Sequence, residues 1–243
     1  MTHSFFRILF ATALVAACTH PDASAHDAQK PADAGDSSAA VHTEGGRVAA
    51  STLRDSISDR TDRGRIAGDS TARVWLIMAS DFQCPFCKQW HDAAFAGIMQ
   101  KYVSTGRVRL AFMNFPLGQH QNALPAAEAA MCAGVQNKFW PLHEALFATQ
   151  TRWDTSKTPT PVFDSLATAA HVDMNLYHEC VNKHLTMPMI EADRDRSKQY
   201  GANSTPTFII VPGNQVLMGA DANVGPALDA ALAATGSPAG KPD

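Results

Sequence analysis

The stretch DFQCPFCKQW, residues 81–90, places Cys84 and Cys87 at the start of a predicted helix. The run before it, RVWLIMA at residues 73–79, is continuously apolar and typical of a buried strand. After the cysteines, apolar residues recur about every four positions, which predicts a helix over 85–104. The pair therefore lies where a buried strand passes into a helix. Whether it binds zinc, forms a structural disulfide or works as a redox centre decides what can be said of function.

The elements that follow define the fold class. VRLAFMNF at 108–115 is a second strand, and the order strand, helix, strand implies a right-handed parallel unit. TFIIV at 207–211 and the strand at 215–218 flank a Pro-Gly-Asn turn, which predicts a hairpin followed by a helix over 224–234.

The segment between these two halves has helical periodicity throughout. The predicted helices cover residues 125–134, 138–149, 162–170, 173–184 and 188–200. Asp173 is a plausible N-cap of the fourth. The order predicts an α/β protein with a thioredoxin-like fold. An all-helical insertion, at about 118–202, separates the strand-helix-strand half from the hairpin-helix half.

Composition excludes some classes of function. The chain has 243 residues, enough for one generous domain or two small ones, and 45% of them are hydrophobic. Its formal charge of −3 gives no sign of the excess positive charge that nucleic-acid binding requires, so no nucleic-acid partner is expected.

The N-terminal residues resemble a targeting signal. Arg7 and a short apolar run lead to Cys18, which lies in a lipobox-like context and is the expected lipidation site. The signal would then be 1–18, whereas an ordinary small-x-small site would extend it to 1–25. The remaining interpretation is a buried helix at the start of the domain. Either signal carries the chain across a membrane, where disulfides persist.

Polar composition defines the other boundaries. Residues 19–50 contain almost no large apolar side chain and are expected to form a disordered tether. The folded domain is expected over 51–236, with a flexible tail at 237–243.

Several arguments favour a redox role for the cysteine pair. Cys84 precedes the helix and Pro85 suits its first position, so the helix N-terminus can stabilise a Cys84 thiolate. Cys87, one turn later and facing inward, can resolve a mixed disulfide formed on an exposed Cys84. Zinc needs further ligands; His91 is a third, but no fourth is evident, and no metal is expected. A disulfide closing so short a loop would contribute little stability.

DFQCPFC resembles the DsbA-like thiol–disulfide oxidoreductases of bacterial envelopes. Further similar motifs span about 60–234: RGRIAGD (63–69), NFPLGQH (114–120), AAMCAGVQNKFWPLHEALFA (129–148) and STPTFII (204–210). The resemblance implies that Pro206 is a cis-proline beside the cysteines, with the Thr205 backbone available to a substrate strand. The alternative is a trans proline at the start of a strand.

The resemblance bears on other residues as well. Cys132 and Cys180 form an even pair once Cys18 is set aside, which in an oxidising compartment favours a structural disulfide, and several family members carry such a pair. Two buried free thiols are the alternative. Met78 stands where the family often has a buried acid, which leaves the proton route of Cys87 unassigned.

Four further residues have no assigned chemistry. Asp81 is expected to be a turn residue, and packing or surface roles are expected for His120, Trp140 and His143.

The leading hypothesis is a monomeric dithiol oxidase of the bacterial cell envelope that needs no cofactor. Its substrates would be reduced or misfolded envelope proteins, and a membrane redox partner would reoxidise it. A reductase or isomerase is the first alternative, although the polar stretch 19–50 is no dimerisation domain. A tethered metal-binding or chaperone-like module is the second. The sequence specifies neither the redox potential nor the substrates.

Overall fold

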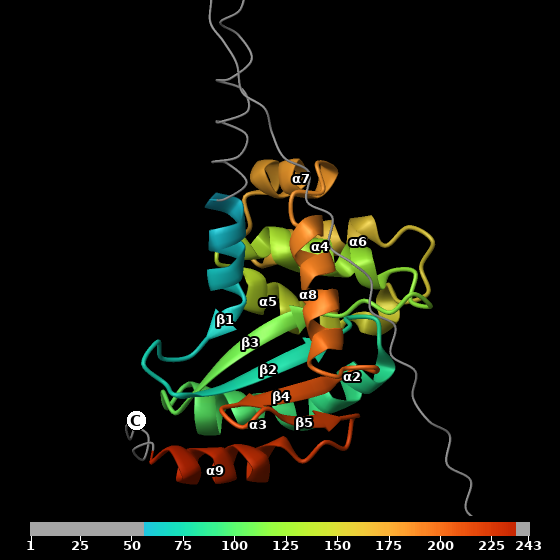
Figure 1. Ribbon diagram of the computed structural model, residues 1–243. Helices are drawn as coiled ribbons and strands as arrows, with labels where there is room; N and C mark the ends of the chain where they lie inside the picture. Colours follow the sequence, from blue (N-terminus) through green and yellow to red (C-terminus); the bar gives the residue numbers. More distant parts are fainter. Residues whose placement is uncertain (1–55, 237–243) are drawn as a thin grey trace, which may run out of the picture. The chain divides into compact units, whose positions relative to one another are not determined.

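A computed structural model describes residues 56–236, and its centre is a five-stranded sheet (Figure 1). The strands are β1 (Ile66–Ala67), β2 (Val74–Ser80), β3 (Val108–Asn114), β4 (Thr207–Val211) and β5 (Gln215–Met218). Their order in the sheet is β1-β3-β2-β4-β5. Strands β2 and β3 are parallel, and the other three pairs are antiparallel. The predicted thioredoxin-like fold is confirmed, but the short edge strand β1 was not predicted.

The register of β2 and β3 positions the site. The two strands pair in parallel from Val74 with Val108 to Ser80 with Asn114, so both end at the same edge of the sheet. Both are central and largely buried, as their apolar sequences require. The residues that follow Ser80 and Asn114 are therefore brought close together.

The helix after the cysteines begins where expected but is not a uniform α-helix. It consists of α2 (Pro85–Trp90), the π-helical turn η1 (His91–Phe95), α3 (Ala96–Ile98) and a second π-helical turn, η2 (Met99–Val103). Together with α9 (Val224–Thr235) it lies against one face of the sheet (Figure 1). Periodicity predicted the helix, but it does not distinguish a π-helical turn from an α-helical one.

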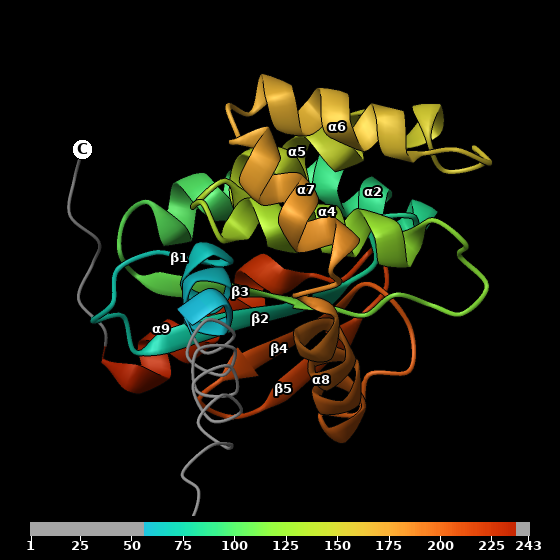
Figure 2. The same cartoon turned by 90° about the horizontal axis from the view of Figure 1, so that it is seen from above.

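The predicted helical insertion lies between β3 and β4. Its helices are α4 (Ala123–Gly134), α5 (Phe139–Ala148), the 3₁₀ turn η3 (Gln150–Arg152), α6 (Thr160–Ala169), α7 (Met174–Asn182) and α8 (Met187–Gln199). Figures 1 and 2 show α4 to α7 gathered on one side of the sheet, while α8 packs on β3. Asp173 caps α7 as predicted, accepting hydrogen bonds from the backbone of Asn175 and Leu176.

Gly64 shows how tightly the start of the described domain packs on the insertion. Residues 56–64 are helical, and a Cβ atom at Gly64 would lie 2.4 Å from the carbonyl oxygen of Gly134 in α4. Only a glycine allows the two backbones to approach so closely.

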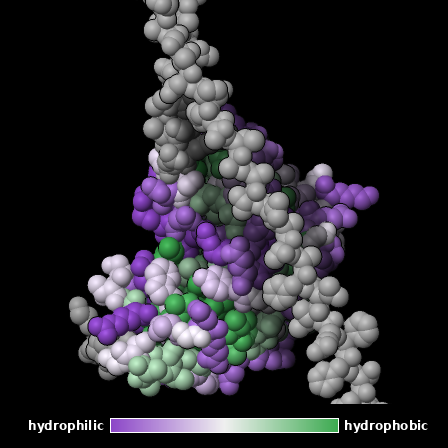
Figure 3. Space-filling view, in the orientation of Figure 1, coloured by the Kyte–Doolittle hydropathy of each residue, from purple (hydrophilic) through white to green (hydrophobic). Residues whose placement is uncertain are grey.

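Apolar packing continues on the second face of the sheet. A small cluster of Ala79, Met113, Phe115 and Ala202 lies there, and Figure 3 shows apolar side chains gathered over the strands beside α8. Among residues 56–236, no helix has the length and apolar character needed to span a bilayer. The predicted signal, Cys18, the tether and the tail at 237–243 lie outside the described residues.

Candidate active site

Cys84 is the N-cap residue of α2. Its backbone is extended, with φ −68° and ψ 124°, and Pro85 occupies the first turn of the helix. The loop before it is held by Asp81, whose carboxylate accepts a hydrogen bond from the backbone of Gln83 at 2.7 Å and whose carbonyl accepts one from the backbone of Cys84 at 3.1 Å. A helix N-terminus offers unpaired N–H groups and a partial positive charge, so the position suits a thiolate.

Cys87 lies one turn further on, and both thiols are free in this structure. The Cys87 sulfur accepts a hydrogen bond from the backbone N–H of Asp81 at 3.5 Å. The side chain of Ser80 also contacts Cys87. Besides Cys84, the polar groups that contact this buried sulfur thus come from the end of β2 and the residue after it, whereas Met78 lies buried in the core.

The two thiols differ sharply in acidity. A hydrogen bond from Cys87 outweighs burial and, with the Thr205 side chain and the backbone N–H groups of Cys87 and Phe86, lowers the pKa of Cys84 to about 6. Burial, reinforced by the adjacent Cys84, raises the pKa of Cys87 well above its ordinary value. A thiolate on Cys84 beside a protonated Cys87 is the division of roles that thiol–disulfide exchange requires.

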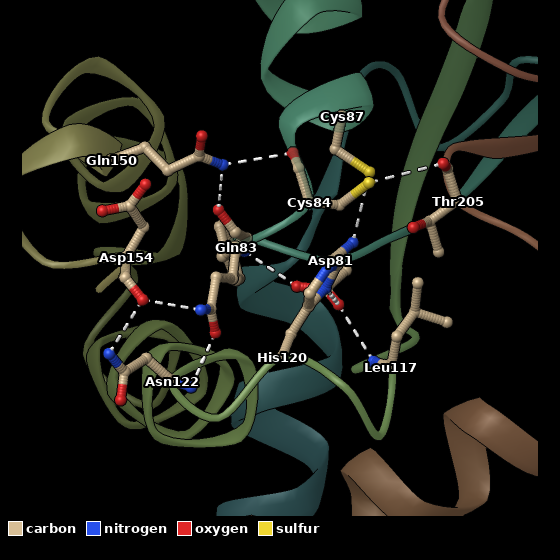
Figure 4. A network of polar contacts seen from close by, with 11 residues as sticks. Asp81, Gln83, Cys84, Cys87, Leu117, His120, Asn122, Gln150, Asp154 and Thr205 are labelled. Atoms are coloured by element: carbon tan, nitrogen blue, oxygen red, sulfur yellow. Dashed lines mark hydrogen bonds and ion pairs between the residues drawn. The ribbon is translucent and has the colours of Figure 1, made fainter. Parts of the chain in front are cut away.

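The loop before β4 closes over Cys84. The Thr205–Pro206 peptide bond is cis, and the Cys84 thiol donates to the Thr205 carbonyl at 3.5 Å (Figure 4). The structure corrects one expectation here: Cys84 is not an exposed nucleophile but only 3% exposed. This loop is far from the cysteines in the sequence. The local pattern around Cys84 therefore could not predict that the loop shields the Cys84 sulfur from solvent.

A polar network from the insertion holds the cysteine loop. The Gln150 side-chain amide donates to the carbonyl oxygens of Phe82 at 2.7 Å and Cys84 at 3.1 Å. The Gln83 side chain accepts from the backbone of Asn122 and donates to the carbonyl of Asp154, each at 2.6 Å (Figure 4). No local sequence pattern marks these residues, because their partners are distant in the sequence.

Asp81 is more than a turn residue. Its buried carboxylate accepts hydrogen bonds from the Leu117 backbone at 2.9 Å and contacts His120 Nδ1 at 2.6 Å. His120, for which packing or a surface position was expected, is part-buried and contacts this carboxylate below the cysteine loop. The parallel ends of β2 and β3 bring the two residues together.

The second cysteine pair is bonded. Cys132 in α4 and Cys180 in α7 form a disulfide with an S–S distance of 2.02 Å. This is the pairing that the resemblance implied. The disulfide joins two helices of the insertion and does not involve Cys84 or Cys87.

Comparison with known proteins agrees with this geometry. A sequence model of the family described as Thioredoxin (Thioredoxin_4) matches residues 60–218. The chain is 23% identical over 172 residues to the probable disulfide bond formation protein D of Bacillus anthracis, covering 65% of this chain and 78% of that protein.

Two further likenesses differ in how much they cover. The chain is 30% identical over 152 residues, 61% of its length, to the Na(+)/H(+) antiporter NhaA 3 of Salinispora tropica, but it spans only 22% of that protein. The structure of oxidised BdbD from Bacillus subtilis is 23% identical and superposes with a TM-score of 0.61, covering 70% of this chain and 94% of that one.

Proposed function

Because the chain belongs to the thioredoxin family, among its DsbA-like thiol–disulfide oxidoreductases, we propose that it is an oxidase that introduces disulfides into other proteins. The observation that carries this direction is the lowered pKa of Cys84 beside the raised pKa of Cys87. Stabilising the thiolate stabilises the reduced form, and a pair whose reduced form is favoured is a strong oxidant when it is oxidised.

The proposed reaction begins with a Cys84–Cys87 disulfide. A substrate thiolate attacks the Cys84 sulfur, the S–S bond breaks, and its electron pair leaves on Cys87, which takes up a proton. A second substrate thiolate then attacks the substrate sulfur of the mixed disulfide and releases Cys84 as a thiolate. The substrate loses two electrons and the cysteine pair gains them, with Cys84 as the good leaving group.

The surroundings of Cys84 support a polypeptide substrate. Once Cys84 carries a substrate sulfur it has no thiol proton to donate, so the Thr205 carbonyl becomes available to a substrate backbone N–H. Phe86 is 59% exposed next to Cys84 and offers an apolar contact. Reduced or misfolded envelope proteins expose apolar side chains and backbone N–H groups, which could contact Phe86 and the Thr205 carbonyl.

The cellular setting is part of the proposal. Each turnover leaves the enzyme reduced, so an electron acceptor must reoxidise Cys84 and Cys87; we assign this to a membrane redox partner. A monomer in the bacterial envelope, anchored through a lipidated Cys18, would meet both that partner and its substrates.

Equilibration with glutathione buffers tests the direction. We expect a potential for the Cys84–Cys87 couple nearer about −120 mV than about −270 mV, the values of strong oxidants and of thioredoxin respectively. A potential near the thioredoxin value would favour a reductase instead. Reduced Cys87→Ser should accumulate mixed disulfides when it is mixed with a disulfide-bonded substrate, because the Cys84 thiolate attacks that disulfide, displaces one substrate thiolate, and no thiol at position 87 resolves the product. Cys84→Ser should form none under the same conditions; mixed disulfides on Cys87 would contradict the assigned roles.

A further inference from the structure

Three metal-ligating side chains meet outside the redox site, between the helix that carries the cysteines and the insertion. They are His91, the first residue of η1, and the adjacent His143 and Glu144 of α5. One donor atom from each lies within 4.8 Å of the other two, and among residues 56–236 this is the group of three such donors that could hold an ion. The donors come from segments far apart in the sequence, so their meeting is a product of the fold.

His143 is the most unusual member of the group. It is 0% exposed, and both of its ring nitrogens lack a hydrogen-bond partner. Six aromatic side chains surround its ring: Phe82, Phe95, Phe112, Phe139, Trp140 and Phe147. A buried polar group left unpaired costs about 1–3 kcal/mol, so a ligand bound to one nitrogen would remove a real penalty.

The distances suit a small cation. Glu144 Oε2 lies 3.2 Å from His91 Nε2, and Glu144 Oε1 lies 3.7 Å from His143 Nδ1. Zinc–nitrogen and zinc–oxygen bonds of about 2.0–2.2 Å place two tetrahedral ligands about 3.3 Å apart. Small rotations of Glu144, which is half-exposed, would close the site.

The second nitrogen of His91 is also arranged as in a metal ligand. His91 Nδ1 lies 3.3 Å from Asp92 Oδ1, and the other oxygen of Asp92 is held by Lys88 Nζ at 2.8 Å. Metal-bound histidines usually direct their second nitrogen to a carboxylate, which fixes the ring and makes the free nitrogen the better donor. His91 Nε2, the nitrogen that faces Glu144, makes no hydrogen bond of its own.

The access route fits as well. His91 and Glu144 line a cavity of about 1100 Å³ together with Phe95, Met99 and Trp140. An ion can enter there, and the cavity leaves a coordination position open.

We propose that His91, His143 and Glu144 form a binding site for a divalent transition metal ion, with zinc as the ion of choice. Two imidazoles and one carboxylate are a ligand set found in zinc sites with an open position, whereas calcium and magnesium prefer oxygen ligands alone. The site would join the cysteine-bearing helix to the insertion one turn beyond Cys87, and it takes no part in disulfide transfer.

Zinc titration of the untagged, full-length protein tests the proposal. The protein is first treated with a chelator and oxidised, so that Cys84 and Cys87 offer no thiolate. We expect calorimetry to show a site of micromolar affinity or better that Glu144→Gln and His91→Ala weaken by at least about tenfold. The matched control, His178→Ala, removes an exposed histidine of α7 whose ring lies 3.2 Å from Asp164 of α6, and it should leave the zinc site unchanged.

Cobalt supplies a second readout. The visible spectrum of bound Co²⁺ should show d–d bands without the intense near-ultraviolet band of thiolate ligation, and Glu144→Gln should abolish them. No zinc binding in this range, or binding that survives both Glu144→Gln and His91→Ala, would overturn the proposal. Because the readout is metal binding by the oxidised protein, it is independent of whether the chain is an oxidase.

Discussion

The hydroxyl group of Thr205 is buried without a hydrogen-bond partner in the described structure, although its side chain lowers the pKa of Cys84. An unpaired hydroxyl beside the sulfur is free to donate to the thiolate once it forms. We therefore predict that Thr205→Val raises the pKa of Cys84 from about 6 toward the ordinary value of about 8.5. The pKa of Cys84 is measured from the thiolate absorbance of the reduced protein as a function of pH.

The control for Thr205→Val is Thr207→Val. The Thr207 hydroxyl donates to the Ser204 carbonyl at 2.7 Å and does not act on Cys84, so this variant should keep the pKa near 6. An equal rise in both variants would show that the loop, and not the Thr205 hydroxyl, sets the acidity.

The acidity of Cys84 also predicts how stability depends on pH. In the reduced native state the pKa of Cys84 is about 6, below the unfolded value of about 8.5. The unfolded state thus binds more protons between these values, and the stabilisation, complete above about pH 8.5, is lost as pH falls to about 6. The oxidised protein lacks this titration.

Urea unfolding of both redox forms between pH 5.5 and 8.5 measures this effect. We expect the free energy of unfolding of the reduced form, minus that of the oxidised form, to fall as pH is lowered and to level off below about pH 6. Above about pH 8.5 the raised pKa of Cys87 has the opposite effect, because only the unfolded state then loses that proton. A difference that is flat across the range would contradict the lowered pKa of Cys84.

At the scale of elements, the 3₁₀ turn η3 connects the insertion to the cysteine loop. Gln150 donates to two buried carbonyl oxygens, those of Phe82 and Cys84. Gln150→Met has a similar size but leaves both oxygens unpaired, so we predict a loss of about 1–3 kcal/mol in the free energy of unfolding. The control Gln136→Met removes two exposed hydrogen bonds to Asp173 and should cost less. Equal losses in urea unfolding would argue against a special role of η3.

The elements also show what the sequence can predict. The apolar run of β2, the periodicity of the insertion helices and the cap at Asp173 are local signals, and each predicted its element. The two-residue strand β1 carries too little pattern to be predicted, since it exists only through pairing with β3. The clamp from Gln150, the contact of Asp81 with His120 and the meeting of His91 with His143 depend on tertiary packing, which no local pattern encodes.

For the molecule as a whole, one buried ion pair joins the start of the domain, the sheet and the last insertion helix. Arg65, next to β1, contacts Asp193 of α8 and also donates to the Phe112 carbonyl in β3 at 3.1 Å. Asp193 accepts two further hydrogen bonds from Asn114, at 3.0 Å from its backbone and 2.9 Å from its side chain. These groups hold α8 against the end of β3, directly before the segment that leads to His120.

Breaking this pair from one side should destabilise the protein strongly. Arg65→Met leaves the Asp193 carboxylate buried without its cation, and we predict a loss of about 3–5 kcal/mol in the free energy of unfolding, measured by urea denaturation. Arg65→Met with Asp193→Leu removes both charges and should recover much of that loss, because the cost arises from the unpaired charge. The control Lys101→Met breaks an exposed pair with Asp229 and should change stability by less than about 1 kcal/mol. If the double variant is as unstable as the single one, the pair holds α8 on the sheet through geometry rather than through charge compensation.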